Sequence, residues 1–161
     1  MNKECHRLAD ALAAAIGGES WYGVSLVATL GDVTAAEAYA HPIADAHSIW
    51  ELVLHVTAWA QLSRGAVRGV PIPAWRTMPK EQDWPIVAKS GEGEWKEAVD
   101  AFFAAHSRLV EAIRASSDDR LEERVPGRAY NFYRLFQSMI QHAAYHGGQI
   151  VLLRKAGGKT A

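Results

Sequence analysis

Apolar positions recur with a helical period along almost the whole chain. Spacings of three and four residues place side chains on one face of an α-helix, whereas β-strands alternate at every second residue. The helical spacing predicts four main helices, over about residues 2–16, 48–68, 93–115 and 131–156. A shorter apolar segment, residues 21–30, either continues the first helix after a kink or forms a separate helix. The pattern therefore predicts an all-α fold, and four amphipathic helices of this length are typical of a four-helix bundle.

Capping residues mark the ends of several of these helices. Thr34 and Glu37 have the spacing of a capping box, which predicts a short helical turn that ends before Pro42. Asn131 is a typical N-cap for the last helix, and the glycine pair that begins at Gly157 is a typical stop.

Two segments lack helical periodicity. Residues 69–89 contain one glycine and four prolines, which predicts a long irregular connection between the second and third main helices. A connection of this length serves either as a crossover between helices or as a lid over a site. Residues 116–130 are polar and form a second predicted loop.

Composition narrows the class of protein. With 161 residues, 49% of them hydrophobic and 22% charged, the chain has the size and make-up of one globular domain over residues 1–161. A net charge of −1 without a cluster of Lys and Arg argues against a nucleic-acid partner. The sequence has neither the continuous apolar run of a signal peptide nor that of a membrane span, and its single cysteine, Cys5, excludes an intrachain disulfide. We therefore expect a cytoplasmic protein without a membrane partner.

Candidate chemistry centres on two histidines of the last helix. His142 and His146 are four residues apart, so both project from one helix face, and that face is the apolar one. Each buried imidazole needs partners for its nitrogens, and one metal ion satisfies two rings at once. A third histidine from another helix would complete a site of the kind that catalytic zinc centres use, and His55 lies at the edge of its helix's apolar face. The alternative is that these are core or boundary histidines with ordinary hydrogen bonds.

Other residues have weaker indications of function. Glu51, one turn before His55, is a candidate to orient a ligand or to transfer a proton, or it simply faces solvent. His106 has the spacing of a core residue, and a second role at the site is the less favoured interpretation. The glycine pair at Gly147 marks a close helix crossing, a bend, a dimer seam or space for a ligand. Trp75 and Trp84, in the proline-rich connection, are candidates to line a pocket.

Two segments of the chain resemble the signature segments of the DinB/YfiT-like superfamily. They are HSIWELVLHVTAW at residues 47–59 and QHAAYHGGQIVLLRK at residues 141–155, and the SWYG segment at 20–23 and the NFY segment at 131–133 add to the resemblance. The resemblance implies a four-helix bundle with a metal site made by His55 of the second main helix and by His142 and His146 of the fourth. It also implies zinc or nickel as the metal and a homodimer. Some relatives are S-transferases or isomerases that use low-molecular-weight thiols.

Three functions are compatible with these observations. The first is a metal-dependent enzyme that activates a thiol or water for a small-molecule substrate, with Glu51 as the candidate catalytic residue and a low-molecular-weight thiol as a candidate cosubstrate. The second is a non-catalytic metal-binding or stress-related interaction protein. The third is a helical bundle whose histidines face inward without a metal.

Overall fold

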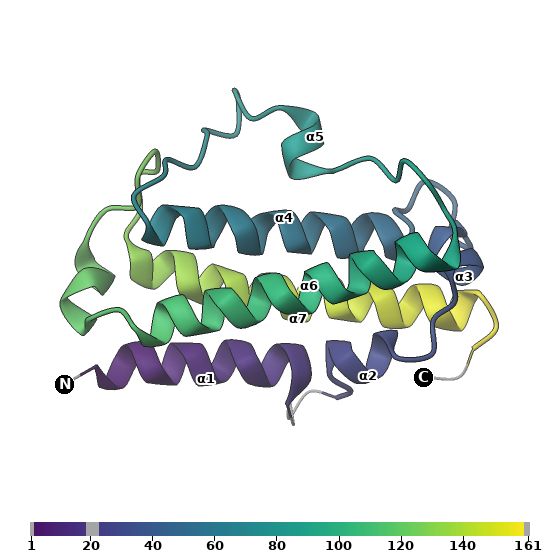
Figure 1. The fold of residues 1–161 in the computed structure, drawn as a ribbon, viewed down its shortest axis with the longest axis horizontal. Coiled ribbons are helices and arrows are strands. Elements are labelled where there is room, and N and C mark those ends of the chain that lie inside the picture. Colours follow the sequence, from purple (N-terminus) through teal and green to yellow (C-terminus); the bar gives the residue numbers. More distant parts are fainter. Residues whose placement is uncertain (1, 19–22, 160–161) are drawn as a thin grey trace.

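The computed structural model describes residues 2–18 and 23–159, and these residues form a bundle of helices (Figure 1). Four long helices make up its body: α1 (Lys3–Gly17), α4 (Ile49–Val67), α6 (Glu92–Arg114) and α7 (Phe132–Ala156). Shorter helical segments lie in the connections: α2 (Leu26–Leu30), α3 (Ala35–Tyr39), α5 (Lys80–Asp83) and the 3-10 helix η1 (Asp118–Glu122). The described residues form no β-strand, and Arg124 and Asn131 pair in an isolated antiparallel bridge. The predicted all-α four-helix bundle is confirmed.

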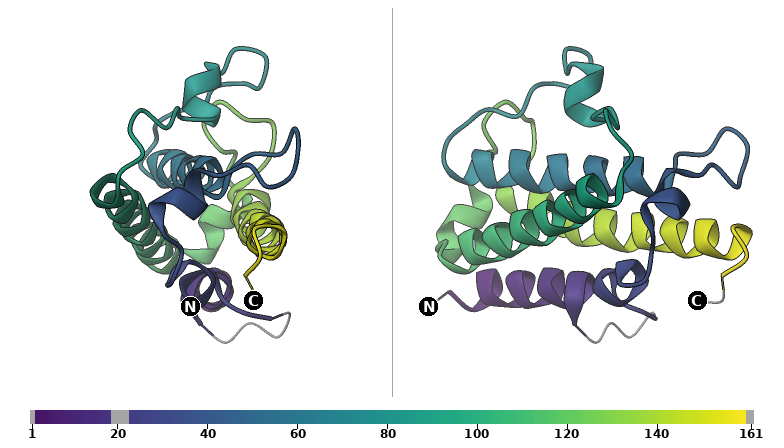
Figure 2. Two further views of the ribbon diagram at one scale, coloured as in Figure 1. Left: turned by 90° about the vertical axis from the view of Figure 1, so that its right-hand side faces the viewer. Right: turned by 45° about the vertical axis from the view of Figure 1, so that its right-hand side comes forward.

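The long helices are not arranged in chain order. Helix α4 packs against α6 and α7, and α1 packs against the same two helices, so α1 and α4 lie diagonally opposite each other (Figure 2, left). Helices α4 and α6 run in one direction, and α1 and α7 run in the other (Figure 1). Because α4 and α6 are parallel, the chain between them must cross the length of the bundle. This geometry explains the long connection over residues 68–91, which we call the crossover.

Capping interactions place the start of the helices that carry the histidines. The Ser48 side chain accepts a hydrogen bond from the Glu51 backbone N–H, and the Glu51 carboxylate accepts one from the Ser48 backbone N–H, which makes a complete capping box. The predicted capping box of Thr34 and Glu37 opens α3 in the same way. At α7 the Asn131 side chain accepts a hydrogen bond from the backbone N–H three residues on. Local sequence therefore sets the helix starts from which the site is built.

Three segments differ from the predicted pattern, one of them the predicted loop over residues 116–130, which contains the 3-10 helix η1. The predicted helix over residues 21–30 is shorter, because α2 begins at Leu26, and the N-terminal residues of that prediction, including Trp21, lie outside the described residues. The predicted irregular connection contains the helical turn α5, which begins after Pro79. Proline suits the position before a helix, but a turn this short has no apolar periodicity that would reveal it.

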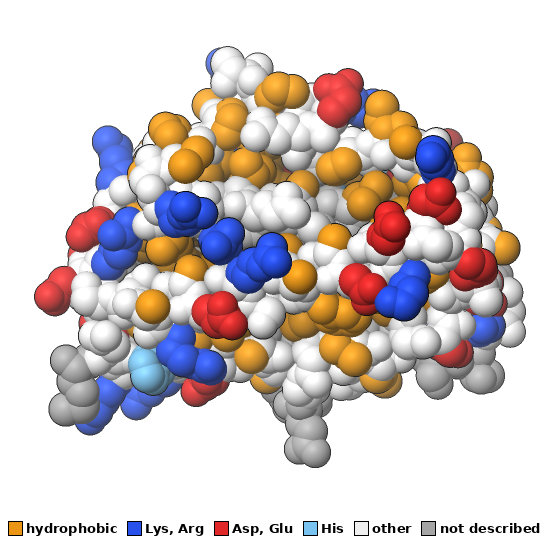
Figure 3. Space-filling view, in the orientation of Figure 1, with side chains coloured by type: hydrophobic (Ala, Val, Ile, Leu, Met, Phe, Trp, Pro, Cys, Tyr) orange, Lys and Arg blue, Asp and Glu red, His pale blue; other side chains and the backbone are white. Residues whose placement is uncertain are grey.

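The interior of the bundle is apolar and contains the only cysteine, Cys5, which is buried. On the face shown in Figure 3, charged side chains of both signs follow α6, whereas apolar side chains gather over the crossover.

None of the helices in the described part of the chain combines the length and the apolar character needed to cross a membrane.

The two glycines inside α7 have different surroundings, which generates a stability prediction. A Cβ atom at Gly147 would lie 3.4 Å from Leu26 Cδ2, whereas a Cβ atom at Gly148 would meet nothing within 4 Å. We expect Gly148→Ala to raise the free energy of unfolding by about 1 kcal/mol, because alanine favours the helix. The Gly147→Ala change should gain less, since its Cβ would lie at the near limit of van der Waals contact with the side chain of Leu26 and not in open space. Urea unfolding of both variants checks this, and an equal gain in both would contradict it.

Candidate metal centre

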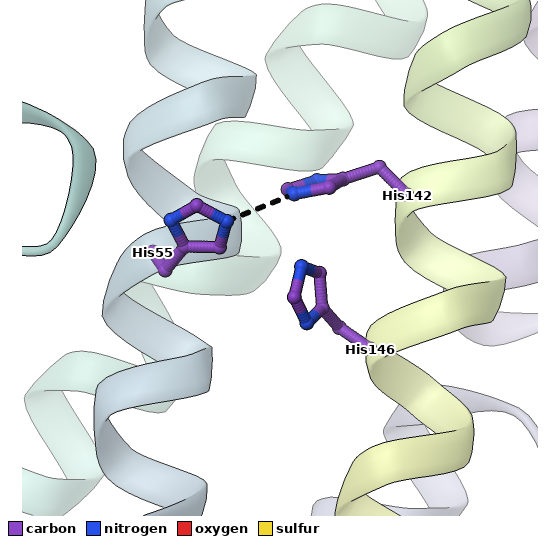
Figure 4. A group of neighbouring side chains, drawn as sticks. All are labelled: His55, His142 and His146. Carbon is purple, nitrogen blue, oxygen red and sulfur yellow. Dashed lines mark hydrogen bonds between the residues drawn. The ribbon is translucent and has the colours of Figure 1, made fainter. Parts of the chain in front are cut away.

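Three histidines from two neighbouring helices meet inside the bundle. His55 lies on α4, and His142 and His146 lie one turn apart on α7, which packs against α4. One donor nitrogen from each ring lies within 4.8 Å of the others. Figure 4 shows the three rings turned toward a common space between the helices. The structure therefore brings together the three residues that the sequence predicts as metal ligands.

The hydrogen bonds of the outer nitrogens assign the tautomers of two rings. His55 Nδ1 lies 2.6 Å from the backbone oxygen of Asp83. A carbonyl oxygen only accepts, so Nδ1 carries the hydrogen and Nε2 has the free lone pair. In the same way His146 Nδ1 lies 2.6 Å from Oε1 of Gln149, whose amide nitrogen donates to the hydroxyl of Tyr145. Both rings thus present an unprotonated Nε2 to the centre, as metal-ligating histidines do.

His142 differs from the other two rings, because its outer nitrogen has no hydrogen-bond partner among the described residues. Its Nε2 lies 3.0 Å from Nε2 of His55, and its Nδ1 is buried without a hydrogen-bond partner among the described residues. One proton can bridge the two Nε2 atoms, but it leaves the lone pair of His146 unused. A cation at the centre accepts all three lone pairs, so the donor set fits a divalent metal ion.

Burial keeps the three imidazoles neutral, which is the state that binds a metal. Burial, reinforced by the neighbouring imidazoles, lowers the pKa of His142 to about 3. It lowers the pKa of His146 to about 4, against the hydrogen bond to Gln149, which raises it. Burial also lowers the pKa of His55, although the contact with Asp83 acts in the opposite direction. At neutral pH all three rings therefore hold lone pairs rather than charge.

The crossover supplies two residues that hold His55 in place. The indole of Trp84 stacks on the His55 ring with centroids 3.9 Å apart, and its other face stacks on His47 at 3.6 Å. The side-chain Oδ1 of Asp83 accepts a hydrogen bond of 2.8 Å from Trp59 Nε1 and lies 3.3 Å from His55 Nδ1. Sequence reasoning missed Asp83, because a backbone carbonyl leaves no trace in the residue pattern and the carboxylate stands in an irregular segment.

Glu51 lies elsewhere. Its carboxylate completes the capping box of α4 and contacts Nε2 of His41 at 3.1 Å and Nδ1 of His47 at 3.5 Å. Burial would raise the pKa of Glu51, but the hydrogen bonds from Ser48 and His41 lower it, so the group is ionised at neutral pH. The carboxylate that contacts a ring of the three-histidine cluster is that of Asp83. A catalytic role for Glu51 stays a prediction. Its carboxylate is linked to the cluster only indirectly: it contacts His47, and the Trp84 indole stacks on both His47 and His55.

His106 behaves as a core histidine. It is 1% exposed, and its Nδ1 lies 2.7 Å from the backbone oxygen of Phe102, one turn earlier on α6. Burial lowers its pKa to about 4, so the ring is neutral at physiological pH. It is not one of the three histidines whose donor atoms converge.

Two clefts border the three-histidine cluster, and His55 lines both. The first, which we call the His146 cleft, has a volume of about 540 Å³ and is lined by Trp84, Tyr145 and Gln149 among others. The second, the His142 cleft, has a volume of about 300 Å³ and is lined by Trp75, Tyr130 and Arg134 among others. The two tryptophans that the sequence marks as candidates for a pocket thus lie in separate clefts beside one centre.

The fold and the site define a class: helical bundles in which three histidines of two helices converge to form a candidate metal centre. The sequence model of the DinB superfamily matches residues 24–150, which is most of the chain and includes all three histidines. The chain belongs to the DinB superfamily. Comparison with curated proteins and with solved structures yields no significant match.

The lowered pKa values predict acid sensitivity of the metal-free protein. Unfolding returns the histidines to a pKa near 6.5, so below that pH the unfolded chain binds protons that the folded chain does not. The contribution of these histidines to the free energy of unfolding is therefore complete above pH 6.5 and is lost as the pH falls toward 4. We expect the free energy of unfolding to decrease by at most about 1.4 kcal/mol per pH unit for each ring.

The test is urea unfolding of the metal-free protein at pH 7 and pH 5. The variant His142→Gln should show a shallower pH dependence than the parent. His6→Gln, which changes an exposed histidine far from the cluster, is the matched control and should keep the slope of the parent. Equal slopes in the parent and in His142→Gln would contradict the assignment.

Proposed function

We propose that this protein is a metal-dependent enzyme whose His55, His142 and His146 hold one divalent ion. The observation that carries the proposal is the convergence of three neutral imidazole nitrogens within 4.8 Å, two of them with lone pairs directed to the centre by their hydrogen bonds. Imidazole donors suit zinc and nickel, which are the proposed metals. A bound ion supplies a Lewis acid that lowers the pKa of a coordinated thiol or water near neutral pH.

The clefts favour an enzyme over a non-catalytic metal-binding protein. A purely structural metal site is closed by four protein ligands, whereas a catalytic site keeps an open position. The described residues offer three converging donors and two clefts that border the cluster, so both a position at the ion and space for reactants are available. A stress-related binding protein is the alternative, and it would require neither cleft.

A low-molecular-weight thiol is the proposed cosubstrate, and transfer to sulfur is the proposed reaction class. The His146 cleft supports this proposal, because its volume of about 540 Å³ falls within the range of sites that hold small ligands. The hydroxyl of Tyr145 and the ring of His47 supply polar groups on its wall. Relatives that the sequence resembles include thiol-dependent S-transferases, which is the second support. Hydrolysis by water is the competing reaction.

Homodimer formation through α7 is part of the same proposal. Tyr145 and Leu152, which also stand at the wall of the His146 cleft, are seven residues apart on α7 and are 65% and 61% exposed. Large apolar groups exposed together often mark a contact with another chain. We place the protein in the reducing cytoplasm, because its one cysteine is buried and cannot form an intrachain disulfide.

Metal analysis tests the centre directly. The protein purified without a histidine tag, and incubated with zinc or nickel, should contain about one metal ion per chain. His55→Ala, His142→Ala and His146→Ala should each lose it, while His6→Ala should retain it. Free metal at a hundredfold excess over Kd should raise the free energy of unfolding of the parent by about 2.7 kcal/mol, and this gain should vanish in the three variants. A parent that binds no metal would refute the proposed function.

A comparison of Asp83 with Glu51 tests which carboxylate supports the ligands. Asp83→Ala keeps the backbone oxygen that bonds His55 Nδ1 but removes the carboxylate that lies 3.3 Å from the same nitrogen. We expect it to weaken metal affinity about tenfold, because a carboxylate beside a ligating histidine raises the basicity of the ring. Glu51→Ala should leave metal affinity unchanged and lower the free energy of unfolding by up to about 1 kcal/mol, since it removes half of a capping box. Competition with a chromophoric chelator measures the affinity. A larger loss of metal affinity in Glu51→Ala than in Asp83→Ala would indicate that Glu51, and not Asp83, supports the ligands.

A further inference from the structure

The two clefts beside the cluster differ in charge. In the His146 cleft the only carboxylate or permanent cation on the described wall is Asp45, and most of the other lining side chains are apolar. The His142 cleft carries the guanidinium of Arg134, and its one carboxylate, Asp83, already accepts a hydrogen bond from Trp59 and lies against His55. The His142 cleft is thus the one that offers an available positive charge.

Arg134 has no anionic partner in the described part of the chain. Its Cζ lies 5.6 Å from the centre of the Tyr130 ring, and its side chain forms no ion pair within residues 2–18 and 23–159. Tyr130 and Ser138 line the same cleft and add two hydroxyl groups. A guanidinium beside hydroxyl groups forms a surface suited to a planar carboxylate, which it can bind through two parallel hydrogen bonds.

A second arginine lies behind the aromatic wall of this cleft. The Arg128 Cζ lies 5.2 Å from the ring of Trp75 and 5.8 Å from the ring of Trp59, and both rings line the cleft. Arg128 is only 9% exposed, and its Nε and Nη2 have no hydrogen-bond partner among the described residues. A buried cation without a carboxylate is costly, and an anion nearby reduces that cost.

We propose that the His142 cleft is the subsite for a small carboxylate-bearing substrate. Arg134 binds the carboxylate, the charge of Arg128 adds to its attraction, and the rings of Trp59 and Trp75 pack against the unsaturated or aromatic body. The opposite end of the molecule then points to His55 and His142. A volume of about 300 Å³ suits a small acid rather than a long chain. This inference rests on the proposed function and names the substrate class of the same site.

Binding to the metal-free protein tests the subsite separately from the metal centre. Isothermal titration calorimetry in the presence of EDTA compares benzoate with benzamide, which has nearly the same shape but no charge. We expect benzoate to bind about tenfold more tightly, as a charge-assisted hydrogen bond predicts. Arg134→Gln and Arg128→Gln should each reduce this preference, and Arg134→Gln should abolish it. Arg108→Gln, an exposed arginine on α6 outside the cleft, should keep the preference.

Two results would overturn the proposal: equal or absent binding of benzoate and benzamide, or a preference that survives Arg134→Gln. Thermal unfolding of each variant confirms that it is folded, so that Arg134→Gln, which changes an exposed side chain, remains decisive if Arg128→Gln is unstable. A protein that prefers benzoate but binds no metal would keep the subsite and refute the proposed function. A protein that binds metal but does not prefer benzoate would keep the proposed function and refute the subsite.

A further arm identifies which reactant carries the acid. In zinc-loaded protein, the binding of 3-mercaptopropionate is compared with that of 2-mercaptoethanol. If Arg134→Gln weakens only the first thiol, the carboxylate belongs to the thiol. If the two thiols bind equally while the protein still prefers benzoate to benzamide, the carboxylate belongs to the second substrate. Either result supports a carboxylate subsite and assigns its source.

Discussion

The hydrogen bond between His55 Nδ1 and the backbone oxygen of Asp83 is the interaction on which the site depends. It joins the crossover to α4, across 28 residues of sequence, at a length of 2.6 Å. It also assigns the hydrogen to Nδ1 and so leaves the Nε2 lone pair directed at His142. Because Trp84 follows Asp83 directly, the same contact brings the indole onto the His55 ring. One backbone carbonyl thus sets the tautomer of a candidate metal ligand, the orientation of its ring and its contact with Trp84.

The three histidine rings differ in how fully their outer nitrogens are hydrogen-bonded. His55 has a carbonyl and His146 has the Gln149 amide as acceptors for the outer hydrogen, whereas the outer nitrogen of His142 has no partner among the described residues. Burying polar nitrogens is unfavourable unless they are bonded, and burial also keeps the rings uncharged. The cluster therefore contributes little to stability without an ion, and a cation makes use of all three lone pairs. Buried polar groups without full hydrogen bonding are common at functional sites, and the three-histidine cluster has this character.

The crossover connects the arrangement of the bundle with the chemistry of the site. It exists because α4 and α6 run parallel, so the chain must return along the full bundle (Figure 1). It contributes Trp75 to the His142 cleft and Trp84 to the His146 cleft, while His55 borders both. The two clefts differ in charge, with Arg134 in one and Asp45 in the other. The three-histidine cluster is therefore bordered by two clefts of different charge.

Short-range features of this protein follow from the sequence alone. The capping boxes at Thr34 and Ser48, the N-cap at Asn131 and the amphipathic periods act within about four residues, so they can be predicted without the fold. The placement of His142 and His146 on one face has the same origin, because a helical turn brings residues four apart together. The similarity of the two signature segments then indicated His55 as their partner.

Only the tertiary structure decided how these local elements are used. His55 and His142 are 87 residues apart, and their contact depends on the packing of α4 against α7. The carboxylate of Glu51 is used locally, as the cap of its own helix, and only the packing of the crossover onto α4 brings the carboxylate of Asp83 to the His55 ring. The clefts, and the two nitrogens of Arg128 that have no hydrogen-bond partner among the described residues, likewise appear only once distant segments are packed. Local periodicity and capping are short-range properties, whereas a site is made by contacts between segments whose meeting depends on the path of the whole chain.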